Sequence, residues 1–137
     1  MGKLKVLLVD DEVAVLEVIS KRIKSWGYDL VTALSGKQAI DLLKSEASDV
    51  IILDYIMAGM DGIATLTEIR KINKEIPVIM FTAYPDDRSM KSAQELNVSA
   101  YIPKSSMLTD PVSNLKTTLA FIEQKLGKNT DGRKKIK

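Results

Sequence analysis

Short apolar runs alternate along the chain with longer amphipathic stretches. The runs are continuous rather than interrupted by polar residues, which is typical of strands that are covered on both faces of a parallel sheet. In the stretches between them, apolar residues recur at the three- and four-residue spacing of a helix that buries one face. We therefore predict five strands, within residues 6–9, 30–31, 50–53, 78–81 and 100–102.

Side chains that can cap a helix precede four of the amphipathic stretches. The side-chain oxygen of Ser or Asp at such a position accepts a hydrogen bond from a backbone N–H group of the first helical turn. The resulting five βα units predict an α/β protein with a parallel sheet, right-handed crossovers and helices on both faces. The predicted capping residues are Ser35, Asp61, either Asp86 or Asp87, and Asp110.

The predicted strands and helices occupy residues 1–126, which we expect to form one domain. Residues 127–137 lack apolar periodicity, and we expect them to be a disordered basic tail. The chain has 20 Lys and Arg residues against 18 Asp and Glu residues. Five of the basic residues and one acidic residue lie in the tail, which leaves 15 basic and 17 acidic residues in the domain. The domain therefore lacks the basic field expected of a nucleic-acid-binding protein.

The composition excludes several kinds of chemistry. The chain contains no Cys and no His, so it cannot form a disulfide, a zinc finger, a thiol nucleophile or a Ser-His-Asp triad. Any reaction must use carboxylates, hydroxyls, Lys, the backbone or a hard cation bound by oxygen. No segment has the roughly 18 apolar residues of a membrane span, and the start of the chain does not fit a signal peptide. We expect a soluble, cytoplasmic protein.

Polar residues follow the predicted strands, at ends that meet at one edge of a parallel sheet. Asp10 and Asp11 follow the first strand, and Asp54 follows the third. Thr82 follows the fourth strand, and Lys104 follows the fifth. Each residue alone has an ordinary explanation as a turn, a cap or an exposed side chain. Together, the carboxylates would repel one another unless a pKa shifts or a cation binds.

This set of residue types fits phosphoryl chemistry. With oxygen ligands alone, the natural cation is Mg²⁺, which uses a few carboxylates together with water and phosphate oxygens. A Lys ammonium group and a Thr hydroxyl facing the metal would complete a site for a phosphoryl group. An Asp carboxylate inside that site is suited to act as a nucleophile that forms an aspartyl phosphate.

Five separated motifs resemble the receiver domain of two-component response regulators, in the order found in that family. They are VLLVDDE at residues 6–12, ILD at 52–54, MAGMDG at 57–62, TAY at 82–84 and AYIPK at 100–104. The resemblance runs from about residue 4 to residue 126. It implies a flavodoxin-like fold, which is a three-layer, doubly wound αβα structure with a five-stranded parallel sheet in the order 2-1-3-4-5.

The resemblance also implies a role for each site residue. Asp54 would accept a phosphoryl group from a phosphohistidine on a sensor histidine kinase or histidine phosphotransfer protein, which must be another chain because this one has no His. Thr82 would hydrogen-bond to the phosphoryl group, and Lys104 would pair with it. The ligands of Mg²⁺, for which Mn²⁺ can substitute, would be Asp10 (largely through water), Asp11, Asp54 and the backbone carbonyl of Ile56.

Thr82 and Tyr101 match the pair that carries the signal in the family. Tyr101 would turn inward as Thr82 moves toward the phosphoryl group, and this would bias the surface formed by the fourth helix, fifth strand and fifth helix. The alternative is a partly buried Tyr with no switching role. We expect a downstream effector protein to bind this surface, which is also a candidate site for a homodimer. We expect no direct contact with nucleic acid or membranes.

The sequence departs from the family pattern near two of these residues. The family usually has Pro where Ala58 stands, and a second Pro, preceded by a cis peptide bond, where Ser105 stands. A cis bond between Lys104 and Ser105 would cost about 2.5–4 kcal/mol. Lys104 is therefore expected either to lie on a strained loop or to approach the site differently.

Three residues flank the phosphoacceptor position where the family sets the lifetime of the phosphoryl group. Ala83 is small enough to leave room for that group, whereas Ile56 and Tyr84 would limit the access of water. We expect slow self-hydrolysis and no catalysis beyond the phosphorylation and dephosphorylation of the chain itself.

Our leading hypothesis is a stand-alone receiver, and three other functions share parts of the pattern. A haloacid-dehalogenase-like phosphatase needs a second Asp where Ile56 stands. A flavodoxin-type flavin module needs a phosphate-binding loop where Asp10, Asp11 and Glu12 stand. A degenerate receiver that acts only through protein contacts is the main alternative, because two prolines are missing.

Overall fold

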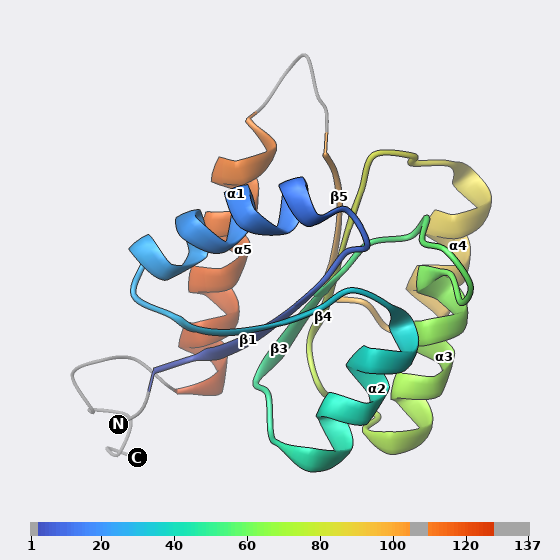
Figure 1. The fold of residues 1–137 in the computed structure, drawn as a ribbon, viewed down its shortest axis with the longest axis horizontal. Helices are drawn as coiled ribbons and strands as arrows, with labels where there is room; N and C mark the ends of the chain where they lie inside the picture. Colours follow the sequence, from blue (N-terminus) through green and yellow to red (C-terminus); the bar gives the residue numbers. More distant parts are fainter. Residues whose placement is uncertain (1–2, 105–109, 128–137) are drawn as a thin grey trace.

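The structure, a computed structural model, describes residues 3–104 and 110–127. Within these residues, five strands alternate with five helices along the chain (Figure 1). The strands are β1 (Lys5–Val9), β2 (Asp29–Ala33), β3 (Val50–Leu53), β4 (Val78–Thr82) and β5 (Ala100–Pro103), and the helices are α1 (Val13–Ser25), α2 (Gly36–Ser45), α3 (Gly62–Ile72), α4 (Asp87–Glu95) and α5 (Pro111–Leu126).

The strands form one parallel sheet in the order β2-β1-β3-β4-β5. This order confirms the predicted α/β class and the strand order of the flavodoxin-like fold. In the ladder between β1 and β3, Val9 lies opposite Leu53. The next residues, Asp10 and Asp54, therefore leave the sheet side by side.

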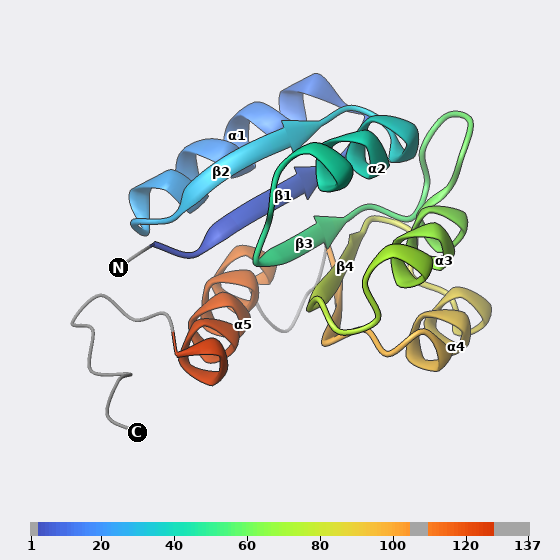
Figure 2. The ribbon, with the colours of Figure 1, turned by 90° about the horizontal axis from the view of Figure 1, so that it is seen from below.

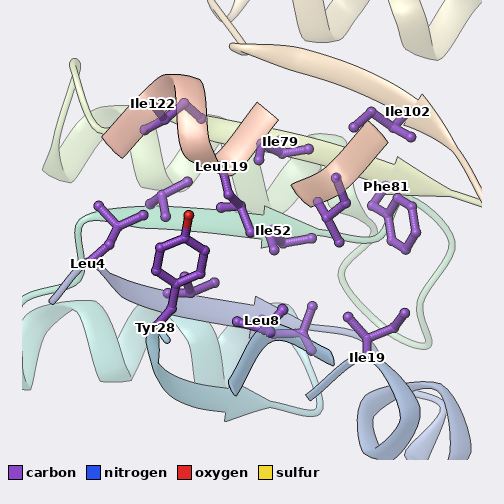
Figure 3. Close-up of a cluster of buried hydrophobic side chains, with 14 of the residues drawn as sticks. Leu4, Leu8, Ile19, Tyr28, Ile52, Ile79, Phe81, Ile102, Leu119 and Ile122 are labelled. Atoms are coloured by element: carbon purple, nitrogen blue, oxygen red, sulfur yellow. The ribbon is translucent and has the colours of Figure 1, made fainter. Parts of the chain in front are cut away.

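The molecule has the three predicted layers. Helices α1 and α5 cover one face of the sheet, and α2, α3 and α4 cover the other (Figure 2). Each face has its own cluster of buried apolar side chains. Figure 3 shows part of the cluster under α1 and α5, which contains Leu119 and Ile122 of α5 together with Leu8, Ile52 and Ile79 of the strands.

Strand β2 is longer than its apolar run indicates. The sequence predicts it at residues 30–31, but it pairs with β1 from Asp29 to Ala33. Because β2 lies at the edge of the sheet, Asp29 and Thr32 stay exposed without breaking the ladder. Backbone hydrogen bonds, rather than apolar side chains, set its length.

The predicted helix caps are present, and Asp86 rather than Asp87 caps α4. Gly127 ends α5 in the left-handed conformation, with φ 73°, as is typical of a glycine that follows a helix. Gly127 therefore belongs to the helix end rather than to the predicted tail, and residues 128–137 lie outside the described residues. No helix in the described part of the chain is both long and apolar enough to cross a membrane. The capping side chains that accept backbone N–H groups are Ser35, Asp61, Asp86 and Asp110.

Candidate functional site

The carboxyl edge of the sheet brings together acidic side chains from two neighbouring strands. Asp10 follows β1 directly, and Asp54 follows β3 directly. Both are buried, with 2% and 5% of their surface exposed. Asp11, half-buried, lies beside them, and one carboxylate oxygen from each of the three residues lies within 4.8 Å of the others. Such an all-oxygen cluster fits a hard divalent cation such as Mg²⁺.

Lys104 reaches this cluster from the end of β5. Its Nζ lies 2.5 Å from Asp10 Oδ2 and 3.5 Å from Asp54 Oδ2. Its backbone N–H donates to the carbonyl of Thr82 at 2.6 Å, which ties the end of β5 to β4. Its ammonium group also lies 6.0 Å from the centre of the Phe81 ring, within reach of a cation–π interaction. The bond to Ser105, where the sequence raised the question of a cis peptide, lies outside the described residues.

The environment of Asp54 favours its protonated form. Burial raises the pKa of Asp54 to about 6, although the charge of Lys104 lowers it and the charge of Asp10 raises it. The N–H group of Tyr55 donates to Asp54 Oδ1 at 2.8 Å and offsets part of this rise. Three carboxylates thus face one ammonium group, and a bound cation would offset the remaining negative charge.

Ala58 gives Asp11 a partner that a proline could not supply. The backbone N–H of Ala58 donates to Asp11 Oδ2 at 2.9 Å, and proline has no N–H group. This hydrogen bond joins the loop after β3 to the loop after β1 and engages one of the two carboxylate oxygens of Asp11. The departure from the family pattern at Ala58 therefore adds a contact to the site.

Gly62 lets the first turn of α3 lie directly against the backbone that carries Asp54. A Cβ atom on Gly62 would collide with the carbonyl oxygen of Asp54 and with the Cα of Tyr55. The N–H of Gly62 donates to the carbonyl of Tyr55 at 2.7 Å. The motif at residues 57–62 includes this glycine, but only the structure shows that the close approach of two backbones requires it.

The hydroxyls of Thr82 and Tyr101 have partners other than the acidic cluster. The hydroxyl of Thr82 accepts the N–H of Tyr84 at 3.0 Å. The hydroxyl of Tyr101 lies 2.6 Å from that of Ser89, at the start of α4, and accepts the N–H of Asp86 at 3.4 Å. Sequence reasoning missed Ser89, because a Ser inside a helix gives no signal that its buried hydroxyl meets a Tyr from another strand.

The structure thus brings together the side chains of four of the predicted site residues. Ile56 lies in the loop after β3, two residues beyond Asp54, with 46% of its surface exposed. Among the described residues, the hydroxyls of Thr82 and Tyr101 contact the β4–α4 region rather than the carboxylates. The four residues that meet are Asp10, Asp11, Asp54 and Lys104.

The fold and the acidic edge define a known class of signalling protein. The family model of the response regulator receiver domain matches residues 6–116, and the chain belongs to this family. Receiver domains are phosphoacceptors of two-component signalling and bind Mg²⁺ at an acidic pocket.

Two curated relatives are transcriptional regulators. The transcriptional regulatory protein ZraR of Escherichia coli strain K12 is 33% identical over 115 residues, which cover 84% of this chain and 26% of ZraR. The probable transcriptional regulator ycf27 of Guillardia theta is 39% identical over 102 residues, which cover 74% of this chain and 40% of that protein. The chain thus matches less than half the length of either relative.

Two solved structures are similar over almost their whole length. The response regulator protein TrrA of Thermotoga maritima, in complex with Mg²⁺ and BeF, is 31% identical with a TM-score of 0.76, and the match covers 87% of this chain and 98% of TrrA. A CheY-like receiver domain protein of Methanospirillum hungatei shares the fold, with a TM-score of 0.81 at 19% identity, over 93% of this chain and 100% of the other.

Proposed function

We propose that this chain is a phosphorylation-dependent receiver in which Asp54 accepts a phosphoryl group from a phosphohistidine of a separate kinase or phosphotransfer protein. The observation that carries this proposal is the meeting of Asp10, Asp11, Asp54 and Lys104 at one largely buried edge of the sheet. The stand-alone action and the cytoplasmic location expected from the sequence belong to the same proposal.

In the proposed reaction, a carboxylate oxygen of Asp54 attacks the phosphorus atom of the donor. The bond from phosphorus to the imidazole nitrogen breaks as the new bond forms. Because the other ring nitrogen of the phosphohistidine carries a proton, the donor leaves as a neutral imidazole. Because the pKa of Asp54 is about 6, its carboxylate is ionised and nucleophilic at neutral pH. The N–H of Tyr55 orients the carboxylate, and Lys104 neutralises charge on the transferred oxygens.

The acidic cluster supports a metal requirement for this transfer. Mg²⁺ would supply positive charge that offsets the repulsion between the carboxylates and the phosphoryl oxygens. The TrrA structure, which is in complex with Mg²⁺ and BeF, supports this part of the proposal by similarity. The proposed ligands are Asp10 (largely through water), Asp11, Asp54 and the carbonyl of Ile56, and Mn²⁺ would occupy the same position.

The contacts of Thr82 and Tyr101 support a route for the signal. We infer that the hydroxyl of Thr82 leaves the N–H of Tyr84 and donates to the phosphoryl group. This would shift the loop before α4, where Asp86 and Ser89 hold the hydroxyl of Tyr101. The surface of α4, β5 and α5 would then differ between the two states and bind a downstream effector or a second copy of the chain.

Exposed apolar residues around the site support a protein as the phosphodonor. Val13, Leu34, Ile56 and Tyr84 are all exposed, and each follows the end of a different strand. They therefore lie at the same edge as the acidic cluster, where they offer apolar contacts to a partner. We infer that the phosphodonor protein binds these apolar residues while its phosphohistidine reaches Asp54.

The test is phosphorylation by a small donor. Incubation with Mg²⁺ and acetyl phosphate, followed by intact mass measurement, should show one added phosphoryl group. Asp54→Asn should lose this adduct, whereas the matched variant Asp41→Asn, on the exposed side of α2, should keep it. A folded wild-type protein that gains no adduct at saturating donor would contradict the proposal and favour the degenerate receiver.

A further inference from the structure

Arg70, in the last turn of α3, donates hydrogen bonds to four backbone carbonyl oxygens. Its Nε donates to Leu96 O at 2.7 Å and its Nη2 donates to Asn97 O at 3.0 Å, both at the C-terminal end of α4. Its Nη1 donates to Ile76 O at 2.8 Å and to Asn73 O at 3.3 Å, beyond the end of α3. One half-buried guanidinium group thus joins the ends of two helices that lie side by side in Figures 1 and 2.

The four carbonyl oxygens, two of them at the helix C-caps Asn73 and Leu96, supply the partial negative charge that balances this cation. The last carbonyl groups of a helix lack partners within the helix and carry the negative end of its dipole. Within the described part of the chain, no carboxylate lies at ion-pair distance from Arg70. Burial lowers the pKa of the Arg70 guanidinium from its ordinary value, but the group stays protonated at neutral pH. The carbonyl oxygens therefore take the place of an acidic partner.

The geometry requires a planar group with several donors. Arginine presents five N–H donors in a fixed fork, so one side chain reaches carbonyls on both helices at once. A lysine in the same position carries the charge on a single atom and cannot span both ends. Asn97, which turns the chain after α4 in the left-handed conformation with φ 60°, presents one of these carbonyls.

The N-terminal end of α4 is held by weaker contacts. There, the hydroxyl of Ser89 lies 2.6 Å from the hydroxyl of Tyr101, and the N–H of Asp86 reaches the same hydroxyl at 3.4 Å. These are hydrogen bonds between neutral groups, which are weaker than hydrogen bonds from a charged donor. The two ends of α4 therefore differ in how firmly they are attached to the rest of the protein.

We propose that Arg70 is a positioning residue that holds the C-terminal end of α4 against α3 as a fixed pivot. A change at Tyr101 would then displace the N-terminal end of α4 and leave the other end in place. This regulation rests on the proposed function, in which Tyr101 and α4 belong to the output surface. Within α4 and the residues that flank it, it restricts the change to residues 86–91 and excludes residues 94–98.

The first test uses the unmodified protein and amide hydrogen exchange. Ser89→Ala removes the contact with Tyr101 and should speed exchange at residues 86–91 several-fold, with no change at residues 94–98. In the Arg70→Met background, the same Ser89→Ala change should speed exchange at both ends. Equal effects at both ends in the wild-type background, or an effect confined to residues 86–91 in the Arg70→Met background, would overturn the pivot.

Arg70→Lys is the matched variant, because it keeps the charge and loses the fork. It should raise exchange at residues 96–98 by about tenfold, as expected when a charge-assisted hydrogen bond is lost. In the Arg70→Lys background, Ser89→Ala should also speed amide exchange at the C-terminal end of α4. Arg70→Lys replaces Arg70→Met in the first test if the Met variant does not fold. A Lys variant with the wild-type exchange pattern would overturn the role of the fork.

An experiment with the phosphorylated protein distinguishes a failure of the pivot from a failure of the proposed function. Acetyl phosphate and Mg²⁺ are added, and the mass of the same sample reports whether Asp54 is modified. With the adduct present, exchange should change at residues 86–91 and stay constant at residues 94–98, whereas equal changes at both ends would overturn the pivot alone. Without an adduct, the proposed function fails, and the Ser89→Ala comparison still decides the role of Arg70.

Discussion

Strand β1 and the residue that follows it bury side chains of opposite kinds. Leu7, Leu8 and Val9 are apolar and at most 2% exposed, and Asp10 is also 2% exposed but acidic. Burying an apolar side chain stabilises the fold by about 1.5–3 kcal/mol. Burying a carboxylate costs free energy unless an opposite charge or hydrogen bonds compensate it. The apolar side chains of β1 thus stabilise the fold by burial alone, whereas the burial of Asp10 depends on Lys104, whose Nζ lies 2.5 Å from Asp10 Oδ2.

This difference separates the interior of the sheet, which stabilises the protein, from its carboxyl edge, which provides the chemistry. At the edge, three carboxylates lie together, two of them within ion-pair distance of Lys104, and the pKa of Asp54 is raised to about 6. The excess negative charge lowers stability, and it also favours binding of a cation. Substitutions in the interior should therefore destabilise the protein, whereas neutralising Asp54 at the edge should stabilise it while removing function.

The largest change in the free energy of unfolding is expected for a substitution in the apolar interior. Leu119, in α5, is fully buried in the cluster of Figure 3, and Leu119→Ala should lower the free energy of unfolding by about 2–5 kcal/mol. Phe121→Ala, on the same helix but at a side chain that is 60% exposed, is the control and should change it by less than about 1 kcal/mol. Urea unfolding measures both, and similar losses would contradict the assignment of the core.

At the edge, Asp54→Asn should raise the free energy of unfolding, in contrast to Leu119→Ala. The folded-state pKa of Asp54, about 6, lies above the ordinary value of 3.8, so its protonated form stabilises the fold below about pH 4. That stability is lost as the pH rises through 6. Asn is neutral throughout, so without divalent ions the variant should gain on the order of 2 kcal/mol over the wild type between pH 4.5 and 7.5. Urea unfolding at both pH values tests this. If the free energy of unfolding changes with pH to the same extent in the variant and the wild type, burial does not raise the pKa of Asp54.

Binding of Mg²⁺ should reverse part of the cost at the edge. Because the ion binds the folded state, a concentration ten times the dissociation constant should stabilise the wild type by about 1.4 kcal/mol. Asp11→Asn and Asp54→Asn should lose most of this gain, whereas Asp41→Asn should keep it. Thermal unfolding with and without MgCl₂, at constant ionic strength, measures the effect, and an equal gain in all variants would point to non-specific binding.

The smallest change in the free energy of unfolding is expected for a substitution of Ala58. Ala58→Pro removes the N–H that donates to Asp11, which should lower the stability of the metal-free protein by about 0.5–1.5 kcal/mol. Ala58→Gly keeps the N–H and makes the loop more flexible, so it controls for changes in backbone freedom. Urea unfolding of both variants without divalent ions measures the loss. Equal free energies of unfolding for the Pro and Gly variants would mean that the hydrogen bond contributes nothing to the edge.

The sequence predicts most of the fold because the signals are local. The cap at Ser35 and the fully buried apolar run of β3 follow from residues within one turn or one strand of each other. The ends of β2 are wrong in the prediction, because they depend on pairing with β1 rather than on the apolarity of β2 itself. The choice of Asp86 over Asp87 as a cap also depends on where the loop from β4 enters α4.

The sequence by itself determined the order of strands and helices and the placement of acidic residues at strand ends. Only the tertiary structure decided which groups meet, because the partners lie far apart along the chain. The pair of Lys104 and Asp10 spans 94 positions, and the hydrogen bond from Ala58 to Asp11 spans 47. The raised pKa of Asp54 depends on burial by the whole fold. Local spacing specifies the elements, whereas the packing of the sheet and its loops sets the distances and burial on which the chemistry depends.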